Sequence, residues 1–488
     1  MTLNRLIYLT HADTEERGEG TDPDRSGRWY AGSGIAPLRA TDAGYISKRS
    51  GSMYPQVYRK IEEIASRLEA RDPVLASMFR QCYPNTLETT VEWLEDGTTF
   101  VITGDIPAMW LRDSSAQVRP YVRLAAEDPD LRRTIRGLIR RQAMYISIDP
   151  YANAFNKENN GRGHASDRTV RSGWVWERKF ELDSLCYPVQ LCQDYWQATG
   201  DPEPFDDQVR RMFYRIVEIM RIEQRHDRDS AYSFERDDRY LPTDTLPFGG
   251  RGTRTNETGM VWSGFRPSDD ACTFGFHIPS NMFAAVVLRH METLAATVFH
   301  DPVLSESASR LRREIEFGIE TYGKAIHPKY GLIYAYETDG YGNFNWMDDA
   351  NVPSLLSIPY LGYRPADDPV YRNTRAFALS RDNPYYCAGA CARGIGSPHT
   401  PAGYVWPLGL IMQGMTSTDP AEQDEVLRML ASTTADTGYM HESFDPNDPD
   451  NFTRSWFAWA NSLFGEFVCR WLESGQDAGN RIAMGGSM

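Results

Sequence analysis

Segments with helical periodicity follow one another along most of this chain, and they restrict its fold more than any other feature. Apolar residues recur at helical spacing in about twelve segments. The strand signals are two hairpins, at 91–103 and 331–345, which turn at Asp96-Gly97 and Asp339-Gly340. Strands do not alternate with helices, which argues against a parallel α/β fold. Besides one helix near residue 110, the expected helices cover 57–68, 131–146, 182–198, 205–224, 279–299, 303–325, 352–358, 369–379, 404–415, 420–431 and 455–472.

Consecutive helices joined by short connectors pack as antiparallel pairs, and six such pairs can close a ring. The sequence has no fixed-period repeat of the solenoid kind, which favours a closed ring over an open superhelix. We therefore predict an all-α fold, a toroid of six helical hairpins or (α/α)6 barrel, with a few β-hairpins in its loops. Residues 1–53 are expected to form an irregular leader, 54–473 a single catalytic domain, and 474–488 a flexible tail.

Composition and charge narrow the class of ligand and the compartment. The net charge of −15 argues against nucleic acid or an anionic membrane as a partner, since both require a basic surface. Seven cysteines without a CxxC pair indicate reduced thiols rather than a disulfide framework or a zinc ribbon. The first twenty residues lack a signal-peptide pattern, and no apolar run reaches transmembrane length. Together these features predict a cytoplasmic protein without a metal or cofactor, and they leave its oligomeric state open.

The stretch 104–121, GDIPAMWLRDSSAQVRPY, combines residue types that are unusual for a core element. Pro107 is expected near a helix start, and Trp110, Asp113 and Gln117 then share one helix face. An indole can stack on the apolar face of a pyranose, while Arg112 and Asp113 can exchange hydrogen bonds with neighbouring hydroxyls. The alternative is an ordinary first helical turn with a solvated Arg–Asp pair. The candidate sugar-binding residues here are Asp105, Trp110, Arg112 and Asp113.

Four further clusters of carboxylates and aromatic rings fall between the expected helices, where loops at one end of a toroid can converge. They lie at 174–188, 262–282, 345–354 and 383–445. Their candidate site residues are Asp183, Arg266, Asp269, Asp270, Asp348, Asp349, His399, Tyr404 and Glu442.

Paired carboxylates have an ordinary interpretation as well as a catalytic one. Asp after Ser is common at helix N-termini, where carboxylates accept free N–H groups, and His399 could simply pack between helices. Glycoside hydrolysis, however, needs one protonated and one ionised carboxyl group. Since adjacent carboxylates oppose each other's ionisation, Asp269 beside Asp270 supplies a plausible general acid, and Glu442 a plausible base.

Seven strings in this order resemble glycoside hydrolase family 125, the metal-independent exo-α-1,6-mannosidases. They are GDIPAMWLRDSSAQVRPY, FELDSLCYP, SGFRPSDDAC, IPSNMF, WMDDANVPSLL, GIGSPHTP and MHESF, and the resemblance covers about residues 54–473. It implies an (α/α)6 barrel that removes terminal α-1,6-linked mannose from oligosaccharides with inversion. The acid would be Asp269 or Asp270 and the base Glu442. Arg112, Asp113, Asp348, Asp349 and His399 would line the same site.

Two other classes of function fit parts of this pattern. The pairs Asp269-Asp270 and Asp348-Asp349 could hold magnesium for diphosphate ionisation, as in a cyclase-like α toroid, although such a site also needs basic residues for the phosphates. A glycan-binding protein that has lost catalysis is the other alternative. Both carboxyl positions are occupied here, so hydrolysis is the prediction that we carry forward.

Overall fold

The computed structural model of the chain describes residues 53–485, and its side chains through residue 474. The predicted leader, residues 1–53, therefore lies outside the described residues except for Met53. The last helix, α17 (Ala458–Gly485), continues into the segment predicted to be a tail. In the described range no helix is both long enough and apolar enough to span a membrane.

Two kinds of helix alternate along the chain. All eight residues of α5 (Leu111–Val118) are buried, as are all residues of α15 (Pro407–Met415) except the last. In α8 (Asp207–Glu223), by contrast, buried residues recur every three or four positions, so only one face is covered. A helix that is buried all round belongs to the inside of a bundle, and an amphipathic one to its surface.

The chain therefore builds an inner and an outer layer of helices. The inner elements are α5, α7 (Leu182–Thr199), α11 (Ile278–Thr297), α13 (Ile358–Leu361), α15 and α17. The outer helices are α2 (Pro55–Glu69), α3 (Pro73–Cys82), α6 (Pro129–Ile148), α8, α12 (Pro302–Tyr322), α14 (Pro369–Ala378) and α16 (Pro420–Ala431).

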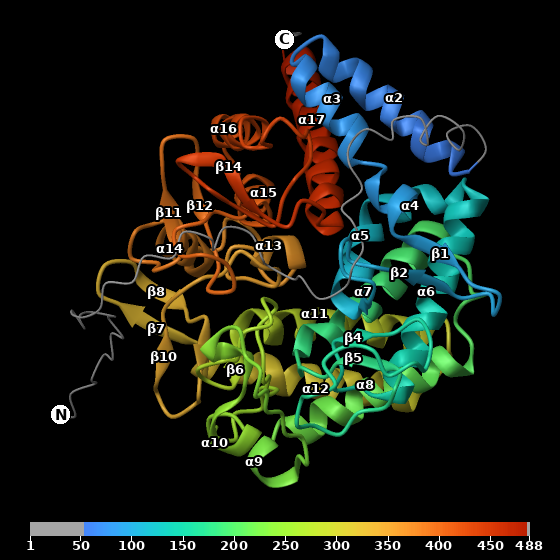
Figure 1. Ribbon diagram of the computed structural model, residues 1–488, viewed down its shortest axis with the longest axis vertical. Coiled ribbons are helices and arrows are strands. Elements are labelled where there is room, and N and C mark those ends of the chain that lie inside the picture. The colour runs from blue at the N-terminus through green and yellow to red at the C-terminus, as the bar shows by residue number, and fades with distance from the viewer. Residues whose placement is uncertain (1–52, 486–488) are drawn as a thin grey trace, which may run out of the picture. The chain divides into compact units, whose positions relative to one another are not determined.

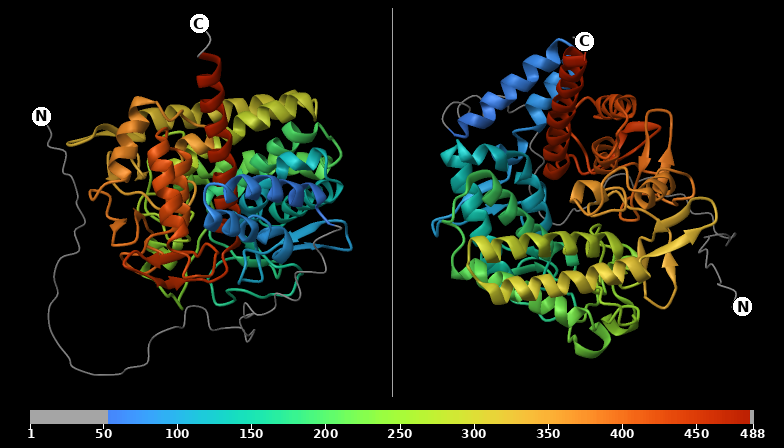
Figure 2. Two further views of the ribbon diagram at one scale, coloured as in Figure 1. Left: turned by 90° about the horizontal axis from the view of Figure 1, so that it is seen from above. Right: turned by 180° about the vertical axis from the view of Figure 1, so that it is seen from behind.

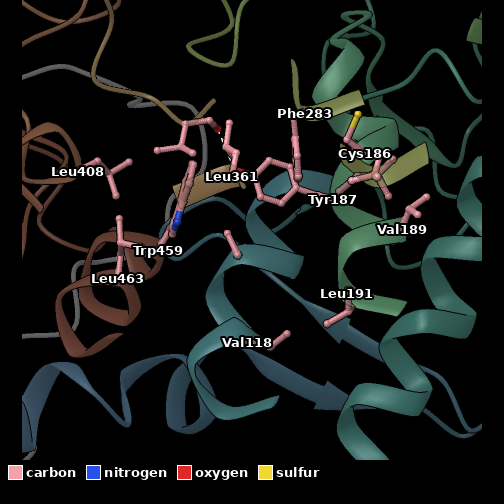
Figure 3. Close-up of a cluster of buried hydrophobic side chains, with 14 of the residues drawn as sticks. Val118, Cys186, Tyr187, Val189, Leu191, Phe283, Leu361, Leu408, Trp459 and Leu463 are labelled. Carbon is pink, nitrogen blue, oxygen red and sulfur yellow. Dashed lines mark hydrogen bonds between the residues drawn. The ribbon is translucent and has the colours of Figure 1, made fainter. Parts of the chain in front are cut away.

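Side chains from all six inner elements meet in one apolar cluster (Figure 3). Tyr187 of α7 makes edge-on ring contacts with Phe283 of α11 and Trp459 of α17, at centroid distances of 5.0 and 6.3 Å. Its hydroxyl donates a hydrogen bond to the carbonyl oxygen of Val352, 2.9 Å away, so this buried phenol is satisfied. The other labelled side chains are Val118, Cys186, Val189, Leu191, Leu361, Leu408 and Leu463.

The last helix completes the arrangement, since α17 packs against α3 and α5 from the start of the domain (Figures 1 and 2). Each of the other inner elements is followed by its outer partner: α5 by α6, α7 by α8, α11 by α12, α13 by α14, and α15 by α16. The helices thus form the predicted (α/α)6 barrel. Because inner and outer helices alternate along the chain, the inner helices begin at the same end.

Short antiparallel strands lie in the loops between the helices. The pairing of β1 (Val91–Trp93) with β2 (Thr99–Val101) confirms the first predicted hairpin. The pairing of β9 (Glu337–Thr338) with β10 (Phe344–Asn345) confirms the second one over 337–345 only, because 331–334 pairs with 324–327 instead. The remaining strands are β3 (Met109–Trp110), β4 (Ala154–Phe155), β5 (Val175–Glu177), β6 (Phe276–His277), β7 (Lys324–His327), β8 (Gly331–Tyr334), β11 (Tyr386–Ala388), β12 (Arg393–Ile395), β13 (Ser443–Asp445) and β14 (Asp448–Thr453).

Two of the predicted helix positions are wrong. The helix expected at 352–358 is a loop, and α13 begins only at Ile358, because the Asp348 carboxylate accepts the N–H groups of Leu355 and Leu356. Side chains that bind backbone groups in this way compete with a helix. Pro107 does not start a helix either, since the chain first forms strand β3 and α5 begins at Leu111.

Candidate active site

The predicted site residues gather at the starts of the inner helices. Asp113 lies in the first turn of α5 and Asp183 in the first turn of α7. The loops before α11, α13, α15 and α17 carry most of the others: Arg266, Asp269, Asp270, Asp348, Asp349, His399, Tyr404 and Glu442. Since the inner helices begin at one end of the barrel, distant parts of the sequence meet there, and the helix N-termini favour negative charge.

Asp269 lies at the tip of a tight loop. The bridge between Phe265 and Ala271 closes this loop, and within it the N–H groups of Arg266 and Asp269 donate to the carbonyls of Asp270 and Arg266. Asp269 has a φ of 69°, in the left-handed region that few residues with a side chain adopt. Its side chain is half-buried, whereas that of the neighbouring Asp270 is buried.

Asp270 is held as an ionised partner of His399. Burial opposes its ionisation, but His399 and the hydroxyl of Thr243, which donates to Oδ1, hold the pKa of Asp270 below its usual value. His399 Nδ1 lies 3.7 Å from Asp270 Oδ2. Burial disfavours the charged imidazole, yet the negative charges of Asp270, Glu442 and Asp269 raise the pKa of His399 to about 9. A carboxylate with a lowered pKa is a poor proton donor, which leaves Asp269 as the better candidate acid.

Glu442 immediately precedes β13 and is only 7% exposed. One carboxylate oxygen accepts a hydrogen bond from Thr453 Oγ1 at 3.0 Å, and the other from Arg454 Nη1 at 3.3 Å. The same guanidinium also binds the carboxylate of Asp105. Arg454 thus links the candidate base to the loop before α5. Donors on both oxygens hold the carboxyl group of Glu442 in one orientation.

Arg112 lies among acidic side chains and is buried. Its Nη1 donates to Glu181 Oε2 at 2.7 Å and to Asp183 Oδ2 at 3.0 Å, and its Nε lies 3.6 Å from Asp113 Oδ2. The single positive charge of Arg112 is shared among these three carboxyl groups, and Asp113 is also buried. Burial therefore raises the pKa of Asp113 to about 6, and the charge of Asp269 adds to this effect, although Arg112 and Arg454 oppose it. Arg112 and Asp113 do lie together, as the sequence pattern suggested.

The side chains of Asp348, Asp349 and Arg266 form hydrogen bonds with other residues of the loops. Both oxygens of Asp348 accept backbone N–H groups, at 2.8 and 2.9 Å, and burial raises the pKa of this carboxyl to about 8. Asp349 accepts hydrogen bonds from Ser397 Oγ and Asn351 N. Arg266 donates through Nε to Glu337 Oε1 at 2.6 Å.

Two aromatic candidates lie differently. Trp110 is 6% exposed in strand β3 and packs in a small apolar cluster with Ala108 and Ala154, separate from the main core. Tyr404 is half-buried and lies beside the β13–β14 hairpin, since its neighbour Val405 forms a bridge with Phe444 of β13; burial and the charges of Asp445 and Asp448 raise the pKa of Tyr404. The predicted contact of these two rings with a sugar therefore stays a prediction.

Several buried polar atoms around these carboxylates have no hydrogen-bond partner in the described part of the chain. Such atoms cost free energy unless a ligand or water satisfies them, and the hydroxyl groups of a sugar can both donate and accept. These atoms are Asp183 Oδ1 and Ser268 Oγ, together with Arg112 Nε, Asp270 Oδ2 and His399 Nδ1, each of which has an oppositely charged group 3.6–3.7 Å away instead of a hydrogen-bond partner. Among the side chains described, those of residues 53–474, no three from His, Cys, Asp or Glu are arranged to hold a metal ion.

Four residues that contact the candidate site residues were not among those predicted from the sequence. Asn153, Lys179 and Arg454 lie outside the acidic-aromatic pattern that was searched, and Glu337 belongs to a strand of a hairpin. A search for basic or amide residues beside each carboxylate cluster could have found Lys179, two positions after Glu177. Asn153 and Arg454 carry no comparable signal, because the fold alone brings them to the site.

Asp113 supplies a test of these electrostatics. A folded pKa of about 6 against 3.8 means that ionised Asp113 costs about 3 kcal/mol of stability. The pKa of Asp113 is higher in the folded than in the unfolded protein. The neutral carboxyl group therefore gives the folded state its full stability below pH 3.8, and this stability is lost as the pH rises through about 6. Asp113→Asn should therefore raise the free energy of unfolding by the whole of this amount, about 3 kcal/mol, at about pH 7.5, and by about half of it at about pH 5. Urea unfolding of both proteins at each pH measures this, with the exposed Asp367→Asn as control; a gain independent of pH would contradict it.

The barrel, together with carboxylates and unpaired polar atoms at one end, defines a glycoside hydrolase of the (α/α)6 class. The model of the metal-independent alpha-mannosidases, GH125, matches residues 72–469. The chain belongs to this family. A protein named meiotically up-regulated gene 157 protein, from Schizosaccharomyces pombe, is 40% identical over 438 residues, which make up 86% of each chain.

Solved structures show the same relationship. A metal-independent alpha-mannosidase of Streptococcus pneumoniae, in a non-productive complex with alpha-1,6-mannobiose, is 46% identical with a TM-score of 0.84. The match covers 86% of this chain and 99% of that one. A point variant of another glycosidase is 12% identical with a TM-score of 0.50, covering 82% and 97% of the two chains, and so shares the fold alone.

Proposed function

We propose that this protein is an exo-acting α-1,6-mannosidase that inverts the configuration at the anomeric carbon. The observation that carries the substrate assignment is the similarity over almost the whole length of the Streptococcus pneumoniae enzyme, which holds α-1,6-mannobiose. Membership of a metal-independent family argues against the magnesium-dependent alternative. Both carboxyl positions being filled argues against a binding protein that has lost catalysis.

In this proposal Asp269 is the general acid and Glu442 the general base. Asp269 donates its proton to the glycosidic oxygen as the bond to the anomeric carbon breaks. Glu442 takes a proton from the water that attacks the same carbon from the opposite face, so that β-mannose is released. Exchange of one proton with solvent then returns both carboxyl groups to their starting states. Asp269 supports the first role because it is half-buried and lies outside the His399 ion pair.

The proposed function predicts linkage selectivity without a metal requirement. Incubated with EDTA, the protein should release mannose from α-1,6-mannobiose at least about tenfold faster than from the α-1,2 and α-1,3 isomers, because the linkage decides whether the glycosidic oxygen reaches Asp269. Chromatography of released mannose measures this. From a longer α-1,6-mannan, mannose should appear before any oligosaccharide. Activity that needs added zinc or calcium, or early mixed oligosaccharides, would count against the proposal.

A further inference from the structure

A buried lysine contacts the main chain of the candidate acid. Lys179 lies between β5 and α7 and is 1% exposed. Its Nζ donates a hydrogen bond to the carbonyl oxygen of Asp269 at 2.7 Å. The same nitrogen lies 3.2 Å from Asp244 Oδ1 and 3.8 Å from Glu177 Oε1. A charged donor so fully buried is costly unless its partners compensate it, so this arrangement indicates a specific role.

A second residue contacts the side chain of the same aspartate. Asn153 Nδ2 donates to Asp269 Oδ1 at 3.1 Å and to Glu177 Oε2 at 2.9 Å. The amide oxygen of Asn153 accepts the backbone N–H of Lys179 at 3.1 Å. Lys179 and Asn153 are therefore bound to each other, one holding the carbonyl group of Asp269 and the other its carboxyl group.

The conformation of Asp269 explains why it needs external support. A left-handed backbone is unfavourable for a residue with a side chain, and it persists only where surrounding contacts impose it. Within the turn, the Asp269 N–H donates to the Arg266 carbonyl and the Arg266 N–H donates to the Asp270 carbonyl, but neither bond holds the carbonyl group of Asp269 itself. Without the bond from Lys179, the Asp269 carbonyl could rotate away and carry the carboxyl group with it.

The surroundings of Lys179 remove an objection based on charge. A lone ammonium group close to Asp269 would favour its ionised form, the opposite of what a general acid needs. Glu177 and Asp244 both contact Lys179, and despite burial their pKa values are lowered, mainly by Lys179. Glu177 is in turn held by Arg236, which binds Asp167 through two bonds of 2.7 Å. Asp269 therefore shares the charge of Lys179 with Glu177 and Asp244, and does not face a lone ammonium group.

We propose that Lys179 and Asn153 are positioning residues for the general acid. Lys179 fixes the backbone at Asp269, and Asn153 occupies Oδ1, so that Oδ2 carries the proton that passes to the departing glycosidic oxygen. This inference rests on the proposed function, in which Asp269 is the acid. It assigns the two residues to the protonation step and not to binding of the sugar.

The test uses two substrates that differ in their need for protonation. The phenolate of an aryl α-mannoside with an acidic phenol leaves with little protonation, whereas the sugar leaving group of α-1,6-mannobiose must receive a proton. Lys179→Met should lower kcat/KM for mannobiose by about 10- to 100-fold and for the aryl mannoside by less than about fivefold, because a displaced acid slows only the step that uses its proton. Arg236→Met is the matched control: it also strips a buried cation from Glu177 but does not touch Asp269, and it should affect both substrates equally.

Asn153→Ala provides a second variant, which decides the question if Lys179→Met does not fold. It should show the same preference for the aryl substrate, since the carboxyl group of Asp269 is then free to turn. If Asp269→Asn itself shows no such preference, the part of the proposed function that makes Asp269 the general acid is wrong. If Asp269→Asn shows it while the folded Lys179 and Asn153 variants lose activity equally on both substrates, the positioning role alone is overturned.

Discussion

Glu442→Gln is expected to lower kcat by about 10²–10⁴-fold while changing substrate affinity little, because the amide keeps the shape of the side chain and cannot take a proton from water. The contacts of Glu442 support this expectation. Thr453 Oγ1 and Arg454 Nη1 each donate a hydrogen bond to one oxygen, so the carboxyl group is fixed in direction. Steady-state hydrolysis of α-1,6-mannobiose gives kcat, and calorimetry on the inactive variant gives affinity.

A matched control for this substitution lies on outer helix α16. Glu422 is also bound by an arginine, with Arg375 Nη2 at 2.9 Å from both of its oxygens, but it is remote from the carboxylates at the starts of the inner helices. Glu422→Gln should leave kcat nearly unchanged. Proton NMR of the first sugar formed by the wild type is an independent check: α-mannose appearing before β-mannose would show that Glu442 does not activate water for inversion.

Asp269→Asn is expected to have the second-largest effect, and one that depends on the leaving group. Hydrolysis of α-1,6-mannobiose should fall by about 10²–10⁴-fold, whereas hydrolysis of an aryl mannoside with an acidic phenol should fall by less than about tenfold. The reason is that only the sugar leaving group needs the proton of Asp269. Values of kcat/KM for both substrates measure the difference.

Asp270→Asn is the natural comparison, since it changes the neighbouring carboxyl group by the same atoms. Asp270 is buried and paired with His399 and Thr243, so its replacement should slow both substrates to a similar extent by disturbing the site. If the dependence on the leaving group appears with Asp270→Asn instead, the acid has been assigned to the wrong member of the pair.

The choice between Asp269 and Asp270 as the general acid depends on the tertiary structure. From the sequence, Asp269 was the leading candidate and Asp270 the alternative, because adjacency predicts that one pKa rises without saying which. The structure separates them through residues far away in the chain. His399 and Thr243 lie on two other loops and hold Asp270 in its ionised form, whereas Asp269 lies outside this ion pair and accepts a hydrogen bond from Asn153.

Local pattern in the sequence determined the elements and the residue types of the site. Helical periodicity predicted most helices to within a few residues, and the Asp-Gly pairs predicted two hairpins, since both signals depend on neighbours in the chain. Residues 352–358 do not form the predicted helix, because the N–H groups of Leu355 and Leu356 donate to the Asp348 carboxylate. The partners of the catalytic candidates could be decided only by the tertiary structure. Lys179 at Asp269 and Arg454 at Glu442 meet them because the inner helices begin at one end of a closed barrel, and contacts of that kind leave no periodicity in the sequence.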